Sequence, residues 1–259
     1  MKINVIYNKY IPDYETVLAR VETALINQNA EFKSFDLEAM DNYGDISVVI
    51  GGDGTILKAA RYYSETKIPV MGINMGRLGF LSQAGFDKTE LVTESLLGGE
   101  YYTEERIMLT SQGKLALNDF VIKGCNPSRT SKFYLEINGR VVCDYIADGL
   151  IVATPTGSTA YGLSAGGPIL HPVTDCLAIV PICPHTLNTR PMVIPAEEKI
   201  SVKTSDMMLS VSVDGYETFE CIDKISINKS EKKAYLAFLK TNNFYSVLRD
   251  KLYWGNNPY

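Results

Sequence analysis

The segment 51–55, with the sequence Gly-Gly-Asp-Gly-Thr, has the clearest potential for chemistry in this chain. It follows an apolar, β-branched run, and a helical pattern begins directly after it. Three glycines in four positions permit backbone conformations in which N–H groups face an anion, and a helix start adds positive partial charge. A carboxylate would repel a phosphate, so Asp53 is expected to hold a metal ion or to accept a proton. The combination indicates phosphoryl transfer.

A second concentrated segment spans 148–161 and reads Asp-Gly-Leu-Ile-Val-Ala-Thr-Pro-Thr-Gly-Ser-Thr-Ala-Tyr. Its apolar strand ends in small hydroxyl residues and glycine, which cap helices, form turns and let a ligand approach the backbone. Tyr161 adds an aromatic face that can stack on a base. A capped helix start and a ligand-binding loop fit this composition equally well.

A third candidate is the pair Asn118-Asp119. An amide beside a carboxylate can bind ribose hydroxyls or the edge of adenine, because Asn offers both donors and acceptors. Such pairs are more often found in turns for backbone reasons, so the pair alone favours a turn.

The first hundred residues alternate strand and helix patterns, which predicts a parallel sheet with helices on its faces. Ligands of such sheets bind at the carboxyl ends of the strands, where segments 51–55 and 74–80 both lie. The expected strands are 2–7, 30–35, 46–50 and 69–73, and the expected helices are 12–27 and 55–63.

The pattern changes near residue 100 to short β-rich runs separated by turn signals such as Asn138-Gly139 and Asp214-Gly215. This predicts a β-rich second domain of antiparallel character. Residues 243–252 again show a helical pattern. We therefore expect an α/β domain at 1–99, a β-rich domain at 100–240 that binds the ligand, and a segment at 241–259 that packs back on the first domain.

Composition excludes several classes of protein. The 259 residues are 46% hydrophobic and 21% charged, as in ordinary globular proteins. A net charge of -5 argues against a nucleic-acid binder, and no apolar run approaches the ~20 residues that span a bilayer. Five scattered cysteines without a C-x-x-C pair argue against a disulfide framework and a zinc site. With an N-terminus that lacks a signal-peptide pattern, they favour a cytoplasmic location.

Taken together and in this order, the segments resemble the NAD kinases over nearly the whole chain. The resemblance includes Asn-Met-Gly-Arg-Leu-Gly-Phe-Leu at 74–81 and Pro-Ile-Cys-Pro-His-Thr-Leu at 181–187, followed by Arg190-Pro191. The Gly-Gly-Asp-Gly motif is moderately specific, because diacylglycerol-type lipid kinases and phosphofructokinases share it. The run at 148–161 is much more specific.

The resemblance implies that ATP, or polyphosphate in some members, phosphorylates the 2′-hydroxyl of the adenosine ribose of NAD to give NADP. Asp53 matches the catalytic aspartate of the family, which accepts the hydroxyl proton. Gly51, Gly52 and Gly54 would leave room for the donor phosphates. A divalent metal ion, Mg²⁺, would neutralise charge in the transition state, and no residue is assigned to it.

The resemblance also implies residues that bind the nucleotides. Near the adenine and ribose of NAD it places Asn118, Asp119, Thr159, Ala160, Tyr161 and Ser164. It adds Asp148 near the nicotinamide half, and it extends the binding set to Gly52, Asp53, Gly54, Lys58, Phe80 and Ser158.

Several of these positions leave alternatives open. Lys58 can reach a phosphate or belong to a solvated helix face, and Arg77 can face a phosphate or solvent. Ile146 stands where many members have an arginine. The contact that this arginine makes with the donor or a partner would be absent from this chain, or Lys123 or Arg190 would supply it. Asp119 stands where many members have a glutamate, which keeps the charge on a shorter side chain.

Two other functions remain as alternatives. A lipid or sphingoid-base kinase can use the same glycine loop, but the hydroxyl-rich run at 154–161 suits a polar dinucleotide better than an acyl chain. A non-catalytic dinucleotide sensor would not need Asp53. The expected partners are NAD and ATP, in a homodimer or homotetramer, with neither nucleic acid nor membrane.

Overall fold

The computed structural model describes residues 1–76, 79–125, 130–186 and 188–254. The chain divides into two compact units, Met1–Glu105 with Ala234–Tyr259 and Arg106–Lys233. The divisions fall inside two long strands, β6 (Tyr101–Ser111) and β15 (Glu217–Leu239). The domain boundaries expected from the sequence, at 99 and 240, stay a prediction.

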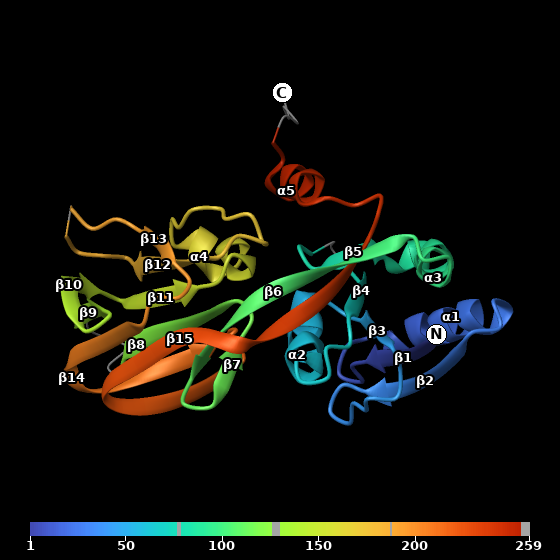
Figure 1. Ribbon diagram of the computed structural model, residues 1–259, viewed down its shortest axis with the longest axis horizontal. Coiled ribbons are helices and arrows are strands. Elements are labelled where there is room, and N and C mark those ends of the chain that lie inside the picture. Colours follow the sequence, from blue (N-terminus) through green and yellow to red (C-terminus); the bar gives the residue numbers. More distant parts are fainter. Residues whose placement is uncertain (77–78, 126–129, 187, 255–259) are drawn as a thin grey trace. The chain divides into compact units, whose positions relative to one another are not determined.

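The first unit is built on a parallel sheet with the strand order β4-β3-β1-β2 (Figure 1). Both β5 and the end of β15 pair in parallel with β4. Its further elements, in chain order, are β1 (Lys2–Tyr7), α1 (Tyr14–Asn27), β2 (Glu31–Asp36), β3 (Ile46–Ile50), α2 (Asp53–Tyr63), β4 (Val70–Asn74), β5 (Ser82–Gly85), the 3-10 helix η1 (Phe86–Lys88), α3 (Thr89–Leu97) and α5 (Phe244–Leu252).

Helices cover both faces of this sheet. Apolar side chains of α1 and α3 form one core cluster with alternate residues of the strands, including Met71 and Ile73. Ile56 of α2 packs against Gly72, which lies between those two residues and therefore faces the other way. Thus α1 and α3 cover one face and α2 covers the other, as the strand–helix alternation predicts.

Three elements of the first unit were not expected from the sequence, namely β5, the short η1 and α3. The strand β5 has the sequence Ser-Gln-Ala-Gly, which lacks the β-branched and aromatic residues typical of strands. It forms because it pairs with β4. The helix α3 carries three threonine and serine residues, which lower its helix propensity, and packing of Val92 and Leu96 into the core stabilises it.

The second unit is antiparallel and β-rich, which confirms the predicted fold class. Its strand order is β13-β12-β11-β8-β14-β15, and β9 pairs with both β14 and β10. Besides the shared strands, its elements are β7 (Lys114–Ala116), β8 (Asp119–Gly124), β9 (Ser131–Ile137), β10 (Arg140–Ala147), β11 (Gly149–Ala153), the 3-10 helix η2 (Thr156–Thr159), α4 (Tyr161–Ser164), β12 (Cys176–Ile182), β13 (Met192–Pro195) and β14 (Ile200–Val213).

The C-terminal helix α5 is fixed at its start and belongs to the first unit. The Asn243 side chain accepts a hydrogen bond from the Ser246 N–H at 2.9 Å and so caps the helix. One residue earlier, Asn242 Nδ2 donates to the backbone oxygen of Gln83 in β5 at 2.8 Å. Among the helices described, none is both long and apolar enough to cross a membrane.

Candidate active site

A cavity of about 640 Å³ opens in the first unit, where β3 and β4 end. Segments 51–55 and 74–80 meet there, as expected for the carboxyl ends of parallel strands. We call it the Asp53 cavity, and its lining residues are Ile11, Pro12, Asp13, Gly52, Asp53, Asn74, Met75, Gly76, Gly79 and Lys251.

The Asp53 carboxylate is held by the backbone of the following turn. Its Oδ2 accepts a hydrogen bond from the Phe80 N–H at 2.8 Å, and its Oδ1 accepts one from the Leu81 N–H at 3.3 Å. The turn approaches so closely that a Cβ added to Gly79 would lie 1.8 Å from Oδ1. Only glycine fits at this position, and the carboxylate therefore has one defined orientation.

The turn that holds Asp53 is itself organised by two buried polar side chains. Asn74 accepts a hydrogen bond from the Gly76 N–H at 2.6 Å and donates to Ser82 Oγ at 3.2 Å. Ser82 Oγ in turn accepts from the Gly79 N–H at 2.9 Å. Because buried polar groups that are fully paired rigidify their surroundings, this network fixes the geometry around Asp53.

The start of α2 faces open space. A Cβ added to Gly52 or Gly54 would meet no atom within 4 Å. Among the described residues, no side chain caps this eleven-residue helix at Gly52. The Thr55 N–H donates to the Gly52 oxygen at 3.0 Å, which leaves the N–H groups of Asp53 and Gly54 available to a ligand. Such a helix start, with its positive partial charge, suits a phosphate.

Two further residues predicted for this region are not among those that line the cavity. Lys58 forms an ion pair with Glu38 and does not line the cavity, so its role in phosphate binding stays a prediction. Phe80 is half-buried, and its ring centroid lies 6.0 Å from Lys251 Nζ. Arg77 lies outside the described residues.

A second cavity, of about 500 Å³, lies within the second unit. We call it the Asp119 cavity. It is lined by Asn118, Asp119, Val121, Lys123, Ala160, Tyr161, Ser210, Ser212, Asp214, Gly215 and Thr218.

The floor of the Asp119 cavity is one face of the paired strands β8 and β14. Residues 119, 121 and 123 alternate along β8, and residues 210 and 212 alternate along β14, with Ser210 opposite Lys123 and Ser212 opposite Val121. The residues between them, which include Phe120 and Val211, belong to the hydrophobic core. Strand alternation thus separates a ligand face from a core face.

Asp119 is a strongly perturbed carboxyl group of this cavity. Its side chain is 3% exposed, and burial together with the neighbouring Asp214 carboxylate raises the pKa of Asp119 to about 7. Asp214 accepts hydrogen bonds from the N–H groups of Leu117, Asn118 and Asp119 at 3.0, 2.7 and 3.2 Å. Within the described part of the chain, no group donates to the Asp119 carboxyl, which leaves its oxygens available to ligand hydroxyls.

The hydroxyl residues after β11 serve mainly to hold their own loop. Thr154 Oγ1 donates to the Leu117 oxygen at 2.5 Å, and Ser158 Oγ accepts from the Leu170 N–H at 3.0 Å. A Cβ added to Gly157 would lie 2.1 Å from the Asn118 oxygen, so this glycine permits the loop to pack on the start of β8. The loop thereby brings Ala160 and Tyr161 to the cavity.

The structure brings together four of the predicted dinucleotide-binding residues, because Asn118, Asp119, Ala160 and Tyr161 all line the Asp119 cavity. Three others do not line it. Ser158 is buried, Thr159 donates to the Thr156 oxygen at 3.3 Å, and Ser164 is exposed, one turn after Tyr161.

Asp148 also lies apart from this group. It is exposed and precedes β11, whereas the loop that carries Tyr161 follows that strand. The two ends of a five-residue strand are roughly 17 Å apart. The role of Asp148 at the nicotinamide half stays a prediction.

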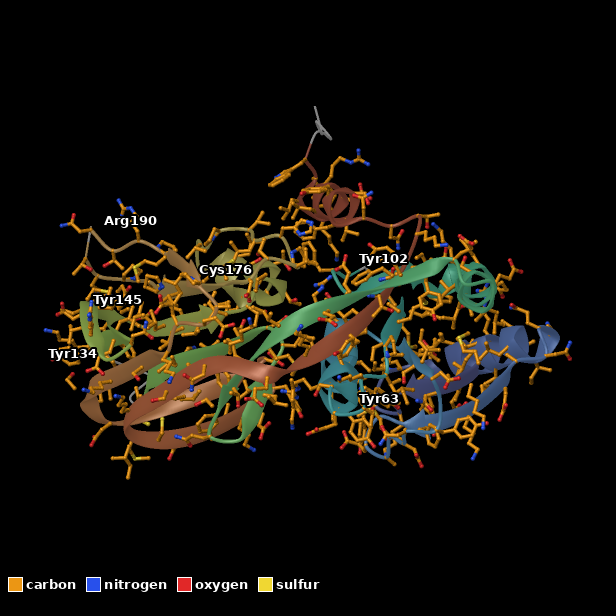
Figure 2. All side chains as sticks on the ribbon, viewed as in Figure 1. Tyr63, Tyr102, Tyr134, Tyr145, Cys176 and Arg190 are labelled. Atoms are coloured by element: carbon orange, nitrogen blue, oxygen red, sulfur yellow. The ribbon has the colours of Figure 1, made fainter. Side chains whose placement is uncertain are left out.

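The two candidates to replace the missing arginine differ in position. Lys123 lines the Asp119 cavity. Arg190 lies on the segment before β13, outside the cavity lining, and its guanidinium donates to the Thr189 oxygen at 2.8 Å (Figure 2). Of the two, Lys123 has the position to contact a ligand of this cavity.

Sequence reasoning missed several lining residues. Ser210, Ser212 and Thr218 stand in alternating strand patterns, which predict a polar strand face but do not mark it as a site. The sequence around Asp214 indicates only a turn. Asp13 and Lys251 carry no signal, because they reach the Asp53 cavity from segments that are distant in sequence from residue 53.

Comparisons with known proteins agree with this arrangement. Residues 11–101 match the ATP-NAD kinase N-terminal domain family, and residues 117–239 match the ATP-NAD kinase C-terminal domain family. The NAD kinase of Ectopseudomonas mendocina is 45% identical over 226 residues, covering 82% of this chain and 77% of that protein. An NAD kinase of Pseudomonas aeruginosa is 43% identical over the same share of each chain.

Solved structures show the same fold. The structure of an NAD kinase from Archaeoglobus fulgidus in complex with ATP has a TM-score of 0.82 and 30% sequence identity, and covers 98% of this chain and 99% of that one. A yeast NADH kinase complexed with NADH has a TM-score of 0.83 at 24% identity, covering 100% and 89% of the two chains, and shows the fold alone. From the two domain matches and the extent of these identities, it follows that the chain belongs to the NAD kinase family, whose members are phosphotransferases.

Proposed function

We propose that Asp53 is the general base in a reaction that transfers the terminal phosphoryl group of ATP to the 2′-hydroxyl of the adenosine ribose of NAD. The observation that carries this proposal is the pair of backbone hydrogen bonds to the Asp53 carboxylate, beside the open start of α2. A fixed carboxylate next to a phosphate-binding helix start has the geometry that general-base catalysis of phosphoryl transfer needs.

In this reaction the ribose oxygen forms a bond to the terminal phosphorus of ATP, and the bond from that phosphorus to the bridging oxygen breaks. ADP leaves with the electron pair of the broken bond. The hydroxyl proton passes to the Asp53 carboxylate, and the products are NADP and ADP. The N–H groups at the start of α2 bind the donor phosphates, because they are available there and carry positive partial charge.

The Asp119 cavity is proposed to bind the adenosine half of NAD. Its carboxylate can accept hydrogen bonds from ribose hydroxyls, and Tyr161 can stack on the base. Asn118 offers both a donor and an acceptor to the adenine edge. The further binding residues implied by the resemblance, Thr159 and Ser164 among them, belong to this proposal.

A divalent cation, Mg²⁺, is proposed to arrive with the donor. Within the described ranges, no group of three or more His, Cys, Asp or Glu side chains could hold a metal ion, but Asp13 and Asp53 both line the Asp53 cavity. One or two carboxylates together with substrate phosphates are the usual ligands of Mg²⁺. When bound, the cation would supply charge neutralisation on the phosphates. The resemblance also suggests polyphosphate as a donor in place of ATP, and this remains a proposal.

A lipid kinase is not favoured. Both halves of the chain match NAD kinase domains, and the floor of the Asp119 cavity carries charged and hydroxyl side chains beside Val121, namely Asp119, Lys123, Ser210 and Ser212, which an acyl chain would not need. A non-catalytic sensor is likewise not favoured, because the relatives that match are kinases.

The test is the variant Asp53→Asn in an assay of NADP formation from NAD, ATP and Mg²⁺. Loss of the base should lower kcat by about 10²–10⁴-fold, because general-base catalysis contributes a factor of that size. The KM for NAD should stay within about threefold, since the asparagine keeps an oxygen that can accept from the 2′-hydroxyl and the other proposed contacts of the adenosine half come from the Asp119 cavity.

Asp13→Asn is the comparison variant, because it removes the other carboxylate of the same cavity, which is proposed to contact only the cation. It should retain at least a tenth of the wild-type turnover. If Asp53→Asn kept near-normal kcat, or if both variants lost turnover equally, the general-base assignment would be wrong and a shared role in holding the cation would replace it.

The oligomeric state and the compartment remain part of the proposal. A homodimer or homotetramer is supported by the resemblance and by exposed apolar side chains on β10, namely Val141, Val142 and Ile146. Sedimentation analysis of the purified chain would test it. A cytoplasmic location is supported by five cysteines that are all free, as expected in a reducing compartment.

A further inference from the structure

Lys251 places a positive charge at the Asp53 cavity, although it lies almost two hundred residues after Asp53. It stands in the last turn of α5 and lines the cavity together with Gly52, Asp53 and Gly79. The hydrogen bonds from Asn242 to Gln83 and the burial of Leu248 hold this helix in the first unit. The position of Lys251 is therefore set by the fold.

The charge of Lys251 is not neutralised by a carboxylate of the described residues. No ion pair involves Lys251 among the residues that the structure describes, whereas Arg249 pairs with Asp250 on the same helix and Lys240 pairs with Glu100. In the described lining of the cavity, Lys251 is the one lysine or arginine, opposed by the carboxylates of Asp13 and Asp53. An ATP triphosphate would meet repulsion from both carboxylates, and a cation at this position would offset it.

Phe80 links this cation to the proposed base. The Phe80 ring centroid lies 6.0 Å from Lys251 Nζ, at the outer limit of a cation–π contact. The backbone N–H of the same residue donates to Asp53 Oδ2 at 2.8 Å. One residue thus positions the ammonium through its ring and the carboxylate through its backbone, so both charges are held relative to the same turn.

We propose that Lys251 binds the terminal phosphates of the donor, as a positioning residue for phosphoryl transfer. The ammonium has three N–H donors and acts as a point charge that suits phosphate oxygens. This inference rests on the proposed function, because it takes the donor to lie in the Asp53 cavity. It adds that the C-terminal helix supplies one of the donor contacts.

The test compares Lys251→Gln, Lys251→Arg and the control Arg249→Gln, each with its thermal unfolding midpoint measured. The control removes one positive charge from the same helix at a residue that does not line the cavity. Steady-state rates are measured with ATP varied at saturating NAD, and then with NAD varied at saturating ATP. Titration calorimetry with ADP and Mg²⁺ measures donor-site affinity without turnover.

In Lys251→Gln we expect the KM for ATP to rise at least tenfold and the ADP affinity to fall similarly, with the KM for NAD within twofold. Lys251→Arg should restore the KM for ATP to within threefold, and Arg249→Gln should behave as the wild type. An unchanged KM for ATP in Lys251→Gln, or an equal effect of Arg249→Gln, would overturn the inference. If Asp53→Asn still loses turnover in that case, only the role of Lys251 fails and the proposed function stands.

Discussion

The two cavities are built in different ways. The Asp53 cavity lies where parallel strands end, and its key contacts come from backbone N–H groups, glycines and a turn held by buried hydrogen bonds. The Asp119 cavity lies on the face of an antiparallel sheet, and its floor is made by side chains that alternate along two paired strands.

This difference teaches where each kind of chemistry can be placed. Backbone groups at strand ends hold one carboxylate in a defined orientation, which suits a reacting group. A sheet face presents several side chains at regular spacing, which suits recognition of an extended ligand. The first kind of site should therefore be sensitive to changes of a single atom, and the second to changes of charge.

Among the variants that leave the Asp53 side chain unchanged, the largest expected effect comes from Gly79→Ala in the Asp53 cavity. The added Cβ would lie 1.8 Å from Asp53 Oδ1, so the carboxylate or the turn must move. Because a displacement of about 1 Å at a reacting group can cost 10²-fold, kcat should fall by about that factor. Steady-state rates of NADP formation measure it.

Gly76→Ala is the matched control in the same turn, since its added Cβ would meet only Asn74 Oδ1, at an ordinary 3.8 Å. It should keep kcat within about threefold of the wild type. Equal losses in the two variants would show that the turn tolerates no side chain anywhere, and the orientation of Asp53 would not be the cause.

A smaller effect is expected from Asp119→Asn in the Asp119 cavity. This variant should be more stable than the wild type but should bind NAD more weakly. The pKa of Asp119 rises from 3.8 to about 7 on folding, so the native state binds the proton more tightly than the unfolded chain. Burying the charged Asp119 carboxylate lowers the free energy of unfolding. This loss of stability is absent below pH 3.8, the pKa of Asp119 in the unfolded chain, grows as the pH rises, and is complete above about pH 7, its pKa in the native state. Asparagine removes this loss of stability.

At about 1.4 kcal/mol per pKa unit, the stability advantage of Asp119→Asn over the wild type should grow by about 2 kcal/mol between pH 5.5 and pH 8. Urea unfolding of the ligand-free proteins at the two pH values measures this difference. The affinity for NAD should fall in the same variant, since a neutral amide accepts ribose hydroxyl bonds less well. If the difference in free energy of unfolding between the variant and the wild type were the same at both pH values, Asp119 would not carry a buried charge above its native pKa.

The smallest effect is expected from Gly54→Ala. This variant tests separately the stability of α2 and the space proposed for the donor phosphates. Gly54 is the second residue of α2, and an added Cβ would meet no atom within 4 Å. Alanine should stabilise the helix by about 0.5–1 kcal/mol, which raises the thermal midpoint by a few degrees. The KM for ATP should nevertheless rise a few-fold, because the methyl group occupies the proposed phosphate space. An unchanged KM would show that the donor does not use this space.

Much of the Asp53 region could be predicted because glycines and an aspartate between a buried strand and a helix are typical of a loop that binds phosphate. The sequence placed α2 and the strands around it, although α2 begins at Asp53 and not at residue 55. It did not predict β5, whose residues have low strand propensity and which forms through pairing with β4.

Other parts of the sites depend on contacts that no local pattern contains. Lys251 reaches the Asp53 cavity only because α5 returns to the first unit, where Asn242 contacts Gln83. Ser210 and Ser212 show the alternation of an ordinary half-exposed strand, and their pairing with β8 makes them part of a cavity. The hydroxyls of Thr154 and Ser158 bond to the backbone of Leu117 and Leu170, contacts that the local pattern did not contain, and the binding role of Ser158 stays a prediction.

The Asp214 turn has a consequence for the way errors in folding would affect this protein. Its carboxylate ties the end of β14 to the first residues of β8, and so fixes the register of the two strands. A slip of one residue would turn Asp119 and Lys123 toward the core and Phe120 toward solvent. A form with the wrong register would therefore lose its stability together with its ligand-binding face, because the same alternation of residues builds the core and the cavity floor. A cell that degrades unstable copies would thereby also remove the inactive ones.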